Sequence, residues 1–279
     1  MKKNRAFLKW AGGKYPLLDD IKRHLPEGDC LIEPFVGAGS VFLNTEYPRY
    51  ILADINSDLI NLYNIVKDRP DEFVTDARAL FTAESNASEV YYAQRKAFNQ
   101  SRDSYHRALL FLYLNRHCYN GLCRYNLSGE FNVPFGRYRR PYFPEAELYV
   151  FAERAQQATF ICESYDATLA KAEKGAVVYC DPPYAPLSAT ANFTAYHTNN
   201  FSMVEQKRLA EMAMSLSQDS HIPVLISNHD TPLTRDWYQG ADLYQIKVRR
   251  SISRSGNSRS KVNELLAMYT ASEPMESTE

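Results

Sequence analysis

The stretch VVYCDPPY, residues 177–184, places an acid, two prolines and an aromatic ring directly after an apolar run. A strand of a parallel sheet ends at the edge where ligands bind, and Pro182 and Pro183 stop the chain from continuing as a helix. We therefore expect free backbone carbonyls at this edge, beside the Asp181 carboxylate and the flat ring of Tyr184. Acceptors that take both hydrogens of an exocyclic NH₂ push electron density onto its nitrogen. The stretch predicts positioning and activation of a planar amine; the alternative is a rigid turn with a surface tyrosine.

A Gly-rich turn, FVGAG at 35–39, follows an earlier apolar run and could hold a second ligand. Glycines there let the backbone approach a ligand at the end of a strand. Asp54 ends the next apolar run, 17 residues after Gly37, close to the spacing at which an acid meets a ribose hydroxyl. The third glycine of a dinucleotide fingerprint is missing, so a ligand with a ribose but no phosphates fits better. The alternatives are a plain tight turn and an acid at a helix N-terminus.

A second Gly-rich turn, KWAGGK at 9–14, carries Trp10 and Lys14. It is not a phosphate-binding P-loop, because Tyr15 follows the lysine where serine or threonine is required. A lysine beside open backbone N–H groups could hold a small carboxylate. The alternative is an N-terminal arm that folds over, with Trp10 as its anchor.

The elements that position these residues alternate between strand and helix. Apolar runs predict strands at 30–35, 50–54, 177–180 and 222–228. Asn56 or Ser57 should cap one helix, and a capping box of Ser202 and Glu205 should begin another, striped by Leu209, Met212, Ala213 and Leu216. Two strands joined by a basic loop within 243–269 predict a β-hairpin. The fold class expected is α/β, a Rossmann-like sheet with a terminal β-hairpin.

The middle of the chain, 68–144, breaks this alternation. A helical stretch at about 88–117 is followed by a loop rich in Tyr, Asn, Arg and Gly, which reads as turns and short strands. We therefore expect a discontinuous catalytic domain of 1–67 and 145–270, and an insert of 68–144 with a β-hairpin loop. An acidic, disordered tail at 271–279 completes the predicted organisation.

The charges are unevenly distributed in this chain of 279 residues with net charge −1. Basic residues gather in 1–14, 116–140 and 247–261, which favours a polyanion on one face; solvated loops are the alternative. The five cysteines lack zinc-motif spacing and fit a reducing cytosol, and Cys180 is expected to be a buried thiol. No secretory signal and no apolar run of membrane-spanning length is seen. We expect a cytoplasmic protein without a metal.

Taken together, the motifs resemble those of the amino-group DNA methyltransferases that use S-adenosyl-L-methionine. DPPY is similar to their catalytic motif, FVGAG to their methionine pocket and LADIN (52–56) to their ribose acid. KWAGGK is similar to the N-terminal motif of the subgroup with the α-type order of cofactor motifs, recognition insert and DPPY. With HCYNGLCRYN (117–126) and FNVPFGRY (131–138), the resemblance covers nearly the whole chain and extends to the bacterial adenine methylases that modify GATC.

The resemblance implies transfer of a methyl group from S-adenosyl-L-methionine to the N6 amine of a flipped-out adenine in duplex DNA, without a metal, leaving S-adenosyl-L-homocysteine. Asp181 and the carbonyls of Pro182 and Pro183 would hold the amine, and Tyr184 would stack on the base. The cofactor contacts that it implies are Trp10, Gly12, Gly13, Lys14, Phe35, Gly37, Gly39, Asp54 and Asp181.

The resemblance also implies a mainly helical DNA-recognition insert. Its DNA contacts would be of four kinds: Tyr119 and Asn120 in the space left by the base; Leu122, Arg124, Pro134 and Tyr138 at base edges; Asn126, Asn132, Arg137 and Arg139 at phosphates; and Lys9 at a base from the cofactor side. Arg124 suits bidentate contact with guanine, although a structural salt bridge is the alternative, as core packing is for Tyr119. The segment 188–201 could order over the base, and 247–261 could meet phosphates.

Two other functions stay open from the residues alone. Cytosine-N4 methylation would use the same amine chemistry, and a DNA-binding protein could retain the scaffold without catalysis. The expected partner is double-stranded DNA, with no membrane and no obligate protein partner, for a monomeric enzyme. Mismatch-repair strand marking, replication control and the GATC site are implied by the resemblance only.

Overall fold

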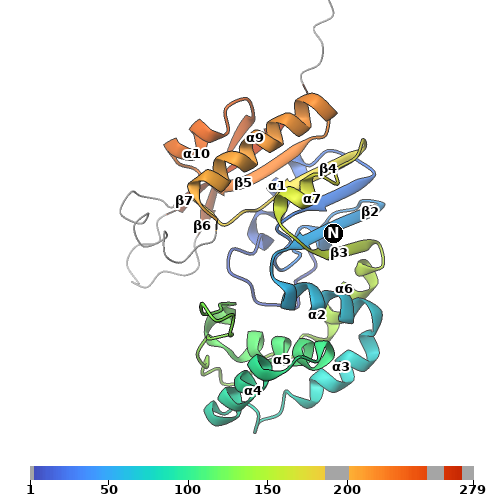
Figure 1. Ribbon diagram of the computed structural model, residues 1–279, viewed down its shortest axis with the longest axis vertical. Helices are drawn as coiled ribbons and strands as arrows, with labels where there is room; N and C mark the ends of the chain where they lie inside the picture. Colours follow the sequence, from blue (N-terminus) through green and yellow to red (C-terminus); the bar gives the residue numbers. More distant parts are fainter. Residues whose placement is uncertain (1–2, 186–200, 250–260, 272–279) are drawn as a thin grey trace, which may run out of the picture. The chain divides into compact units, whose positions relative to one another are not determined.

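The computed structural model describes residues 3–185, 201–249 and 261–271 of the chain (Figure 1). The chain divides into two compact units. The first comprises Met1–Tyr15, Val36–Glu46 and Leu52–Glu163, and the second Pro16–Phe35, Tyr47–Ile51 and Ser164–Glu279. The segment 68–144 lies inside the first unit, and its independence as an inserted module stays a prediction.

Seven strands form one sheet in the order β3-β2-β1-β4-β5-β7-β6. Their bounds are β1 Cys30–Glu33, β2 Arg49–Asp54, β3 Ala158–Cys162, β4 Ala176–Cys180, β5 Val224–His229, β6 Asp242–Arg249 and β7 Lys261–Tyr269. Strand β4 pairs in parallel with β1 and β5, whereas β7 runs antiparallel to both β5 and β6. The expected α/β sheet of Rossmann-like type with a terminal β-hairpin is confirmed.

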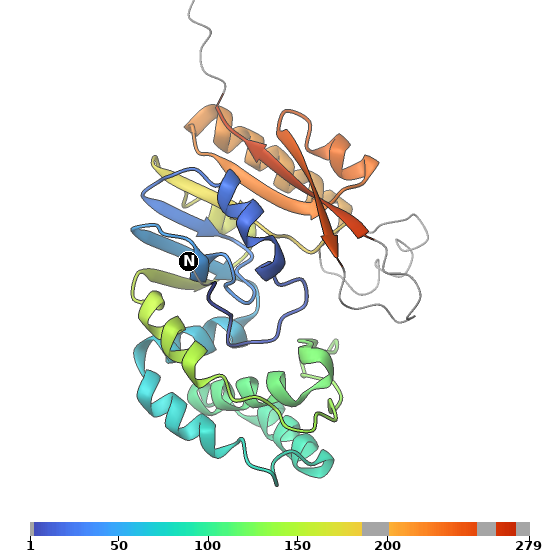
Figure 2. The ribbon, with the colours of Figure 1, turned by 180° about the vertical axis from the view of Figure 1, so that it is seen from behind.

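Strand β4, the central strand of the sheet, shows why an apolar run predicts a strand here. Every residue of β4 is buried, as expected for a parallel strand with helices on both faces. Helix α9 (Met203–Ser220) lies on one face, and α1 (Leu18–His24) lies on the other (Figures 1 and 2). The short helices α7 (Tyr165–Leu169) and α10 (Pro232–Trp237) complete the second unit, with the 3₁₀ turn that ends at Leu17.

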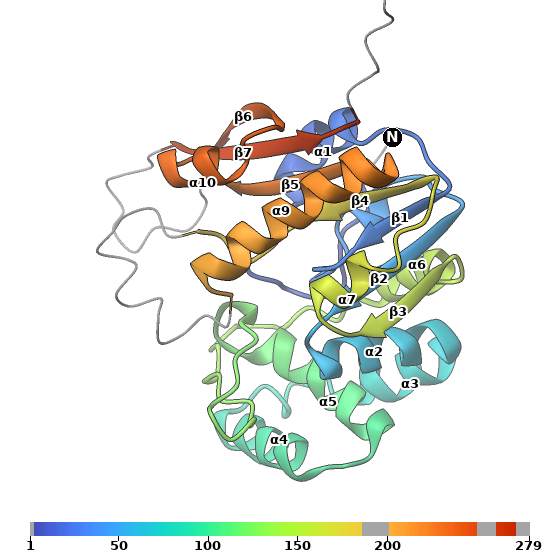
Figure 3. The same cartoon turned by 45° about the horizontal axis from the view of Figure 1, so that its top comes forward.

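Helix α9 runs along β5 (Figure 3), and its predicted apolar stripe packs in a cluster with residues of the sheet. Leu209 and Ala213 are buried in one cluster with strand residues, and Met212 and Leu216 pack against it. The helix begins at Ser202, whose hydroxyl accepts from the Glu205 N–H at 3.2 Å. The predicted capping box is only half formed, because the Glu205 carboxylate accepts from the Tyr165 hydroxyl instead.

The first unit is mainly helical. Its helices are α2 Ser57–Asp68, α3 Pro70–Ala79, α4 Ser88–Gln100, α5 Ser104–His117 and α6 Glu145–Ala155, with 3₁₀ turns at Phe42–Asn44 and Tyr119–Gly121. Helix α2 packs against α5 and α6, and α4 packs against α5. The helical stretch expected at about 88–117 is confirmed and consists of two helices, because the Asp103 side chain accepts from the His106 N–H and starts a new helix.

The chain between α5 and α6 is irregular, as expected. Two isolated bridges, Cys118 with Phe135 and Tyr125 with Phe131, hold it as a loose hairpin. The Asn126 side-chain oxygen (Oδ1) accepts from the N–H groups of both Ser128 and Glu130, which closes the tip. We call residues 118–138 the recognition hairpin.

Three expectations fall wholly or mostly outside the described residues: the segment 188–201 apart from Phe201, residues 250–260 of the basic loop, and residues 272–279 of the acidic tail. Within the described ranges, no helix combines the length and apolarity needed to cross a bilayer.

Candidate functional site

The DPPY turn leaves β4 and is held by the next two strands of the sheet. The Asp181 carboxylate accepts from the Ser227 hydroxyl at 2.9 Å. The Tyr184 hydroxyl donates to the Glu264 carboxylate at 2.8 Å, and its ring meets His229 edge-to-face with centroids 4.7 Å apart. Tyr184 is half-buried, so the alternative of a surface tyrosine is wrong.

One of the two proline carbonyls is not free. Gln206, in the first turns of α9, donates from Nε2 to the Pro183 carbonyl at 2.5 Å. The expectation of two free carbonyls is therefore wrong for Pro183, because a buried amide on the sheet-facing side of α9 occupies one acceptor position of its oxygen. The candidate acceptors for an amine are the Asp181 carboxylate and the Pro182 carbonyl.

Burial keeps the Tyr184 phenol and the neighbouring Cys180 thiol in their protonated, neutral forms. Burial raises the pKa of the Tyr184 phenol well above its usual range, and the negative charges of Asp181 and Glu264 raise it further. Its ring therefore stays a neutral stacking surface. Burial likewise raises the pKa of the Cys180 thiol, and the expectation of a buried thiol is confirmed.

In the first unit, the structure brings Trp10, Gly37 and Asp54 together. The Asp54 carboxylate accepts from the Gly37 N–H at 3.1 Å and from the Asn56 N–H at 2.9 Å. Gly37 has φ +46°, and a Cβ there would lie 2.9 Å from the indole nitrogen of Trp10. A side chain at this position would displace the indole, so the turn requires glycine.

Asp54 fits a ribose ligand chemically. Burial raises its pKa, and the backbone N–H groups of Asn56, Gly37 and Ile55 oppose that shift by stabilising the carboxylate. Each carboxylate oxygen has two acceptor positions, so a position remains for a ribose hydroxyl beside these backbone groups. The alternative of a helix-capping acid is wrong, because Asn56 caps α2 and Asp54 ends β2.

Lys14 lies in the second Gly-rich turn and is 6% exposed. Its ammonium donates to the Gly12 carbonyl at 2.6 Å, and Gly12 has φ +78°. The Gly13 N–H donates to the Trp10 carbonyl at 3.3 Å, which closes the turn. A buried ammonium held in this way suits a carboxylate ligand.

The other predicted cofactor residues divide between the two units. Gly39 belongs to the first and has φ +70°. Phe35 belongs to the second, where it stacks on Tyr165 with ring centroids 5.6 Å apart and an interplanar angle of 19°. Tyr165 was not predicted from the sequence.

In the recognition hairpin, Arg124 and Asn132 contact each other directly. Arg124 donates from Nε to the Asn132 side-chain oxygen at 2.7 Å, and Asn132 donates its N–H to the Arg124 carbonyl at 3.1 Å. The Arg124 side chain is exposed and held by an amide, in contrast to the salt bridge weighed as an alternative. Asn126 has its amide engaged in the hairpin tip.

Tyr119 and Asn120 lie exposed at the start of the hairpin. Tyr119 is 52% exposed, so the alternative of core packing is wrong. Its N–H donates to the carbonyl of Pro134, which is also exposed. Asn120 adopts the left-handed conformation, with φ +55°.

Lys9 reaches the hairpin from the N-terminal turn. Its ammonium lies 3.6 Å from the centroid of the Tyr138 ring, and its N–H donates to the Asn115 side chain at 2.9 Å. Burial lowers the pKa of this ammonium, and the neighbouring Arg116 lowers it further. The remaining predicted contacts differ in exposure: Leu122 is half-buried, whereas Arg137 and Arg139 are exposed.

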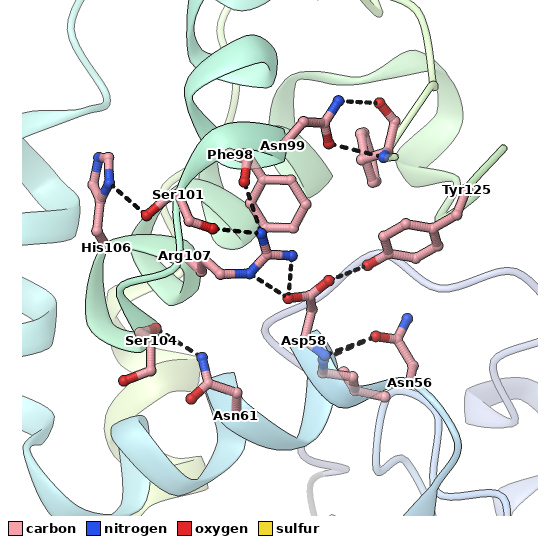
Figure 4. Close-up of polar contacts among 12 residues, drawn as sticks. Asn56, Asp58, Asn61, Phe98, Asn99, Ser101, Ser104, His106, Arg107 and Tyr125 are labelled. Carbon is pink, nitrogen blue, oxygen red and sulfur yellow. Dashed lines mark hydrogen bonds and ion pairs between the residues drawn. The ribbon is translucent and has the colours of Figure 1, made fainter. Parts of the chain in front are cut away.

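A network that the sequence did not reveal ties this hairpin to α2 (Figure 4). Arg107 donates from Nε and Nη2 to one oxygen of Asp58, at 2.9 and 2.7 Å. The Tyr125 hydroxyl donates to the other oxygen at 2.8 Å. Asp58 stands in the first turn of α2, which is a common place for an acid, so nothing in the sequence distinguished it.

We predict that burial of His117, at the end of α5, makes the free energy of unfolding depend on pH. Its ring is buried and stacked on Tyr113, and burial lowers its pKa to about 4. The unfolded chain therefore binds this proton from about pH 6.5 downwards while the folded protein does not. Stability from this group is complete above pH 6.5 and is lost as the pH falls to 4, by about 3 kcal/mol.

Urea unfolding across this pH range measures the effect. His117→Phe should unfold with a shallower loss of stability between pH 6.5 and 4 than the wild type. His106→Gln, which changes an exposed histidine of the same helix, should keep the wild-type slope. Equal slopes for all three proteins would contradict the assignment.

Several side chains around the DPPY turn were missed: Gln206, Ser227, Asn228, His229 and Glu264. Ser227 and Asn228 end an otherwise apolar strand, and Gln206 stands three residues before Leu209 on the apolar face of α9. A polar residue on an apolar face is the signal that could have identified them. Within the ranges that the structure describes, no three His, Cys, Asp or Glu side chains are grouped to hold a metal ion.

Comparison with known proteins gives matches over nearly the whole chain. The sequence model of the family described as D12 class N6 adenine-specific DNA methyltransferase matches residues 10–252. The DNA adenine methylase of Serratia marcescens is 74% identical over 269 residues, which are 96% of this chain and 100% of the relative. That of Escherichia coli (strain K12) is 72% identical over 96% of both chains. That of Vibrio cholerae serotype O1 is 60% identical, covering 97% of this chain and 98% of the relative.

Proposed function

Because this chain belongs to the D12 class of N6 adenine-specific DNA methyltransferases, we propose that the DPPY turn holds and activates the adenine amine. The Asp181 carboxylate and the Pro182 carbonyl accept its two hydrogens, and the Tyr184 ring stacks on the base. The observation that carries this proposal is the anchoring of the turn, in which Ser227 fixes Asp181 and Glu264 fixes Tyr184.

The chemistry follows from the electronic structure of adenine. The N6 lone pair is conjugated into the purine ring, so the amine is a weak nucleophile. Two acceptors aimed at its hydrogens stabilise the positive charge that develops on nitrogen as it is methylated. When bound, S-adenosyl-L-methionine supplies an electrophilic methyl group on a sulfonium, and S-adenosyl-L-homocysteine remains. No metal ion is needed in this scheme.

The first unit would hold the cofactor through Asp54 at the ribose and Lys14 at the carboxylate. Trp10 lies against Gly37, so the indole and the open backbone of the turn would form one wall. Phe35 with Tyr165, and Asp181, are proposed contributions from the second unit. The remaining contacts would come from Gly12, Gly13 and Gly39.

Asp54→Asn is expected to weaken cofactor binding by about 10- to 100-fold. A bond to a carboxylate contributes about 1.5–3 kcal/mol, and the new amide NH₂ would face a backbone N–H. Calorimetric titration with S-adenosyl-L-homocysteine measures this without turnover. Asp68→Asn, the same charge change at the exposed end of α2, is the control. Equal affinity of the Asp54 variant and the control would remove Asp54 from the cofactor site.

Adenine paired in a duplex cannot reach a methyl donor, so the base must leave the stack. We propose that Tyr119 and Asn120 fill the space that it leaves, since both are exposed at the start of the recognition hairpin. Leu122, Pro134, Tyr138 and Lys9 are the proposed base-edge contacts beside Arg124. Asn126, Asn132, Arg137 and Arg139 are proposed near phosphates, where Asn126 and Asn132 would also preserve the hairpin.

The proposed recognition site is GATC. Unmethylated plasmid is incubated with the protein and labelled S-adenosyl-L-methionine. The product should resist restriction enzymes that adenine methylation in GATC blocks, and it should be cut by enzymes that require this methylation. Cleavage patterns should not change for enzymes sensitive to methylation in other tetranucleotides. Protection at a different sequence would reject GATC, and label on cytosine would contradict the adenine assignment.

A further inference from the structure

The DPPY turn directly follows the end of a strand and contains two residues that cannot donate a backbone hydrogen bond. Strand β4 ends at Cys180, which is opposite Ile226 of β5. Pro182 and Pro183 carry no N–H, so this part of the turn cannot continue the ladder. Side chains from neighbouring elements contact the turn at Pro183 and Ala185 and help to set its geometry.

Asn228 of β5 supplies the first of these side chains. It is fully buried, and its side-chain oxygen accepts from the Ala185 N–H at 2.9 Å and from the His229 N–H at 2.8 Å. Its NH₂ group donates to the Gln206 side-chain oxygen at 3.0 Å and to the Tyr238 hydroxyl at 2.8 Å. All four hydrogen-bonding positions of the amide are used.

The orientation of both amides follows from this arrangement. Two backbone N–H groups can meet only an acceptor, so the oxygen of Asn228 must face Ala185. Its NH₂ then faces Gln206, which must present its own oxygen. The NH₂ of Gln206, which is 2% exposed, is thereby directed at the Pro183 carbonyl, 2.5 Å away.

We propose that Gln206 and Asn228 form an amide relay that positions the DPPY turn for methyl transfer. Gln206 donates to the Pro183 carbonyl on one side of Tyr184, and Asn228 accepts from the Ala185 N–H on the other side. The two amides touch no substrate and act as positioning residues. This inference rests on the proposed function, in which Asp181, Pro182 and Tyr184 hold the adenine.

The relay should matter more for the rate of transfer than for binding. A displacement of the turn by about 1 Å would misalign the amine with its acceptors, which can cost about 10²-fold in rate. The contacts of the recognition hairpin with DNA and of the first unit with the cofactor involve other residues. The expected signature is a lower single-turnover rate constant at saturating DNA and cofactor.

Two variants test the relay against one control. Gln206→Met keeps the side-chain volume but removes the donor to Pro183. Asn228→Asp keeps the oxygen that accepts from both backbone N–H groups but has no NH₂ to donate. The Gln206 amide must then turn its NH₂ towards the new carboxylate and its oxygen towards the Pro183 carbonyl. Tyr238→Phe removes one bond to Asn228 without touching the relay's path to the turn.

Both relay variants should lower the single-turnover rate about 10- to 100-fold, with dissociation constants for duplex DNA and S-adenosyl-L-homocysteine unchanged. Tyr238→Phe should transfer at nearly the wild-type rate, and thermal melting identifies any variant that fails to fold. A rate for both relay variants equal to that of Tyr238→Phe, or a loss confined to DNA affinity, would overturn the relay. Asp181→Ala in the same assay separates the hypotheses: full activity there refutes the proposed function, whereas an inactive Asp181→Ala beside active relay variants refutes the relay alone.

Discussion

Asp181→Ala is expected to lower the rate of methyl transfer about 10³-fold or more, with DNA affinity largely retained. The carboxylate is one of two proposed acceptors for the amine hydrogens, and removal of one such preorganised group from an active site costs about 10²–10³-fold. The substitution also removes the negative charge that would stabilise the developing cation. Both losses act on the transition state, so the effect should fall on kcat.

Single-turnover transfer of labelled methyl groups and equilibrium binding to the same duplex measure the two sides of this prediction. Asp181→Asn retains an oxygen for one amine hydrogen and for the Ser227 hydroxyl, so its loss should be smaller. Asp236→Ala, an exposed acid of the second unit, controls for net charge. Near-normal turnover of Asp181→Ala would mean that the DPPY turn does not activate the amine.

Arg124→Ala is expected to relax discrimination at one base pair of the recognition site by about 5- to 150-fold. A bidentate contact between arginine and guanine contributes about 1–3 kcal/mol of discrimination. Asn132 already holds the exposed guanidinium by its Nε, which orders the side chain before DNA arrives. The conformational entropy of Arg124 is therefore reduced before DNA binds, so less is lost on binding. This favours strong discrimination at the base pair that Arg124 contacts.

Methylation rates on duplexes with single base-pair substitutions across the site measure this preference. Arg124→Lys should also lose discrimination, because an ammonium cannot form the planar two-pronged contact. Arg139→Ala, a proposed phosphate contact, should weaken binding uniformly across sequences and reduce the salt dependence. A substitution profile of Arg124→Ala that matches the wild type would remove Arg124 from the base-reading residues.

Local patterns in the sequence predicted the elements well because their cause is local. The apolar run 177–180 lies in a fully buried strand, and Asn56 caps the helix expected after the apolar run 50–54. The spacing of Gly37 and Asp54 predicted a ribose-type turn, and the two residues are hydrogen-bonded. Burial of one face of an element produces a periodic apolar pattern in the sequence, and capping bonds select particular residue types at the start of a helix.

The division of the 88–117 stretch into two helices was not predicted, although a local signal for it is present. The residues Ser101 to Asp103 contain the cap of a new helix, as the bond from Asp103 to the His106 N–H shows. Residues 99–104 are all polar, so the apolar pattern is interrupted where α4 ends and α5 begins.

The sequence by itself determined the fold class, the order of the motifs and the chemical groups available at the end of β4. Only the tertiary structure decided which of these groups are engaged: Gln206 holds the Pro183 carbonyl, Asn132 holds Arg124, and Asp58 joins Arg107 to Tyr125. Most of these bonds join residues far apart in the chain, and that of Tyr184 with Glu264 spans 80 positions. Such partners are selected by strand register and helix packing, which bring side chains together without leaving a pattern in the intervening sequence.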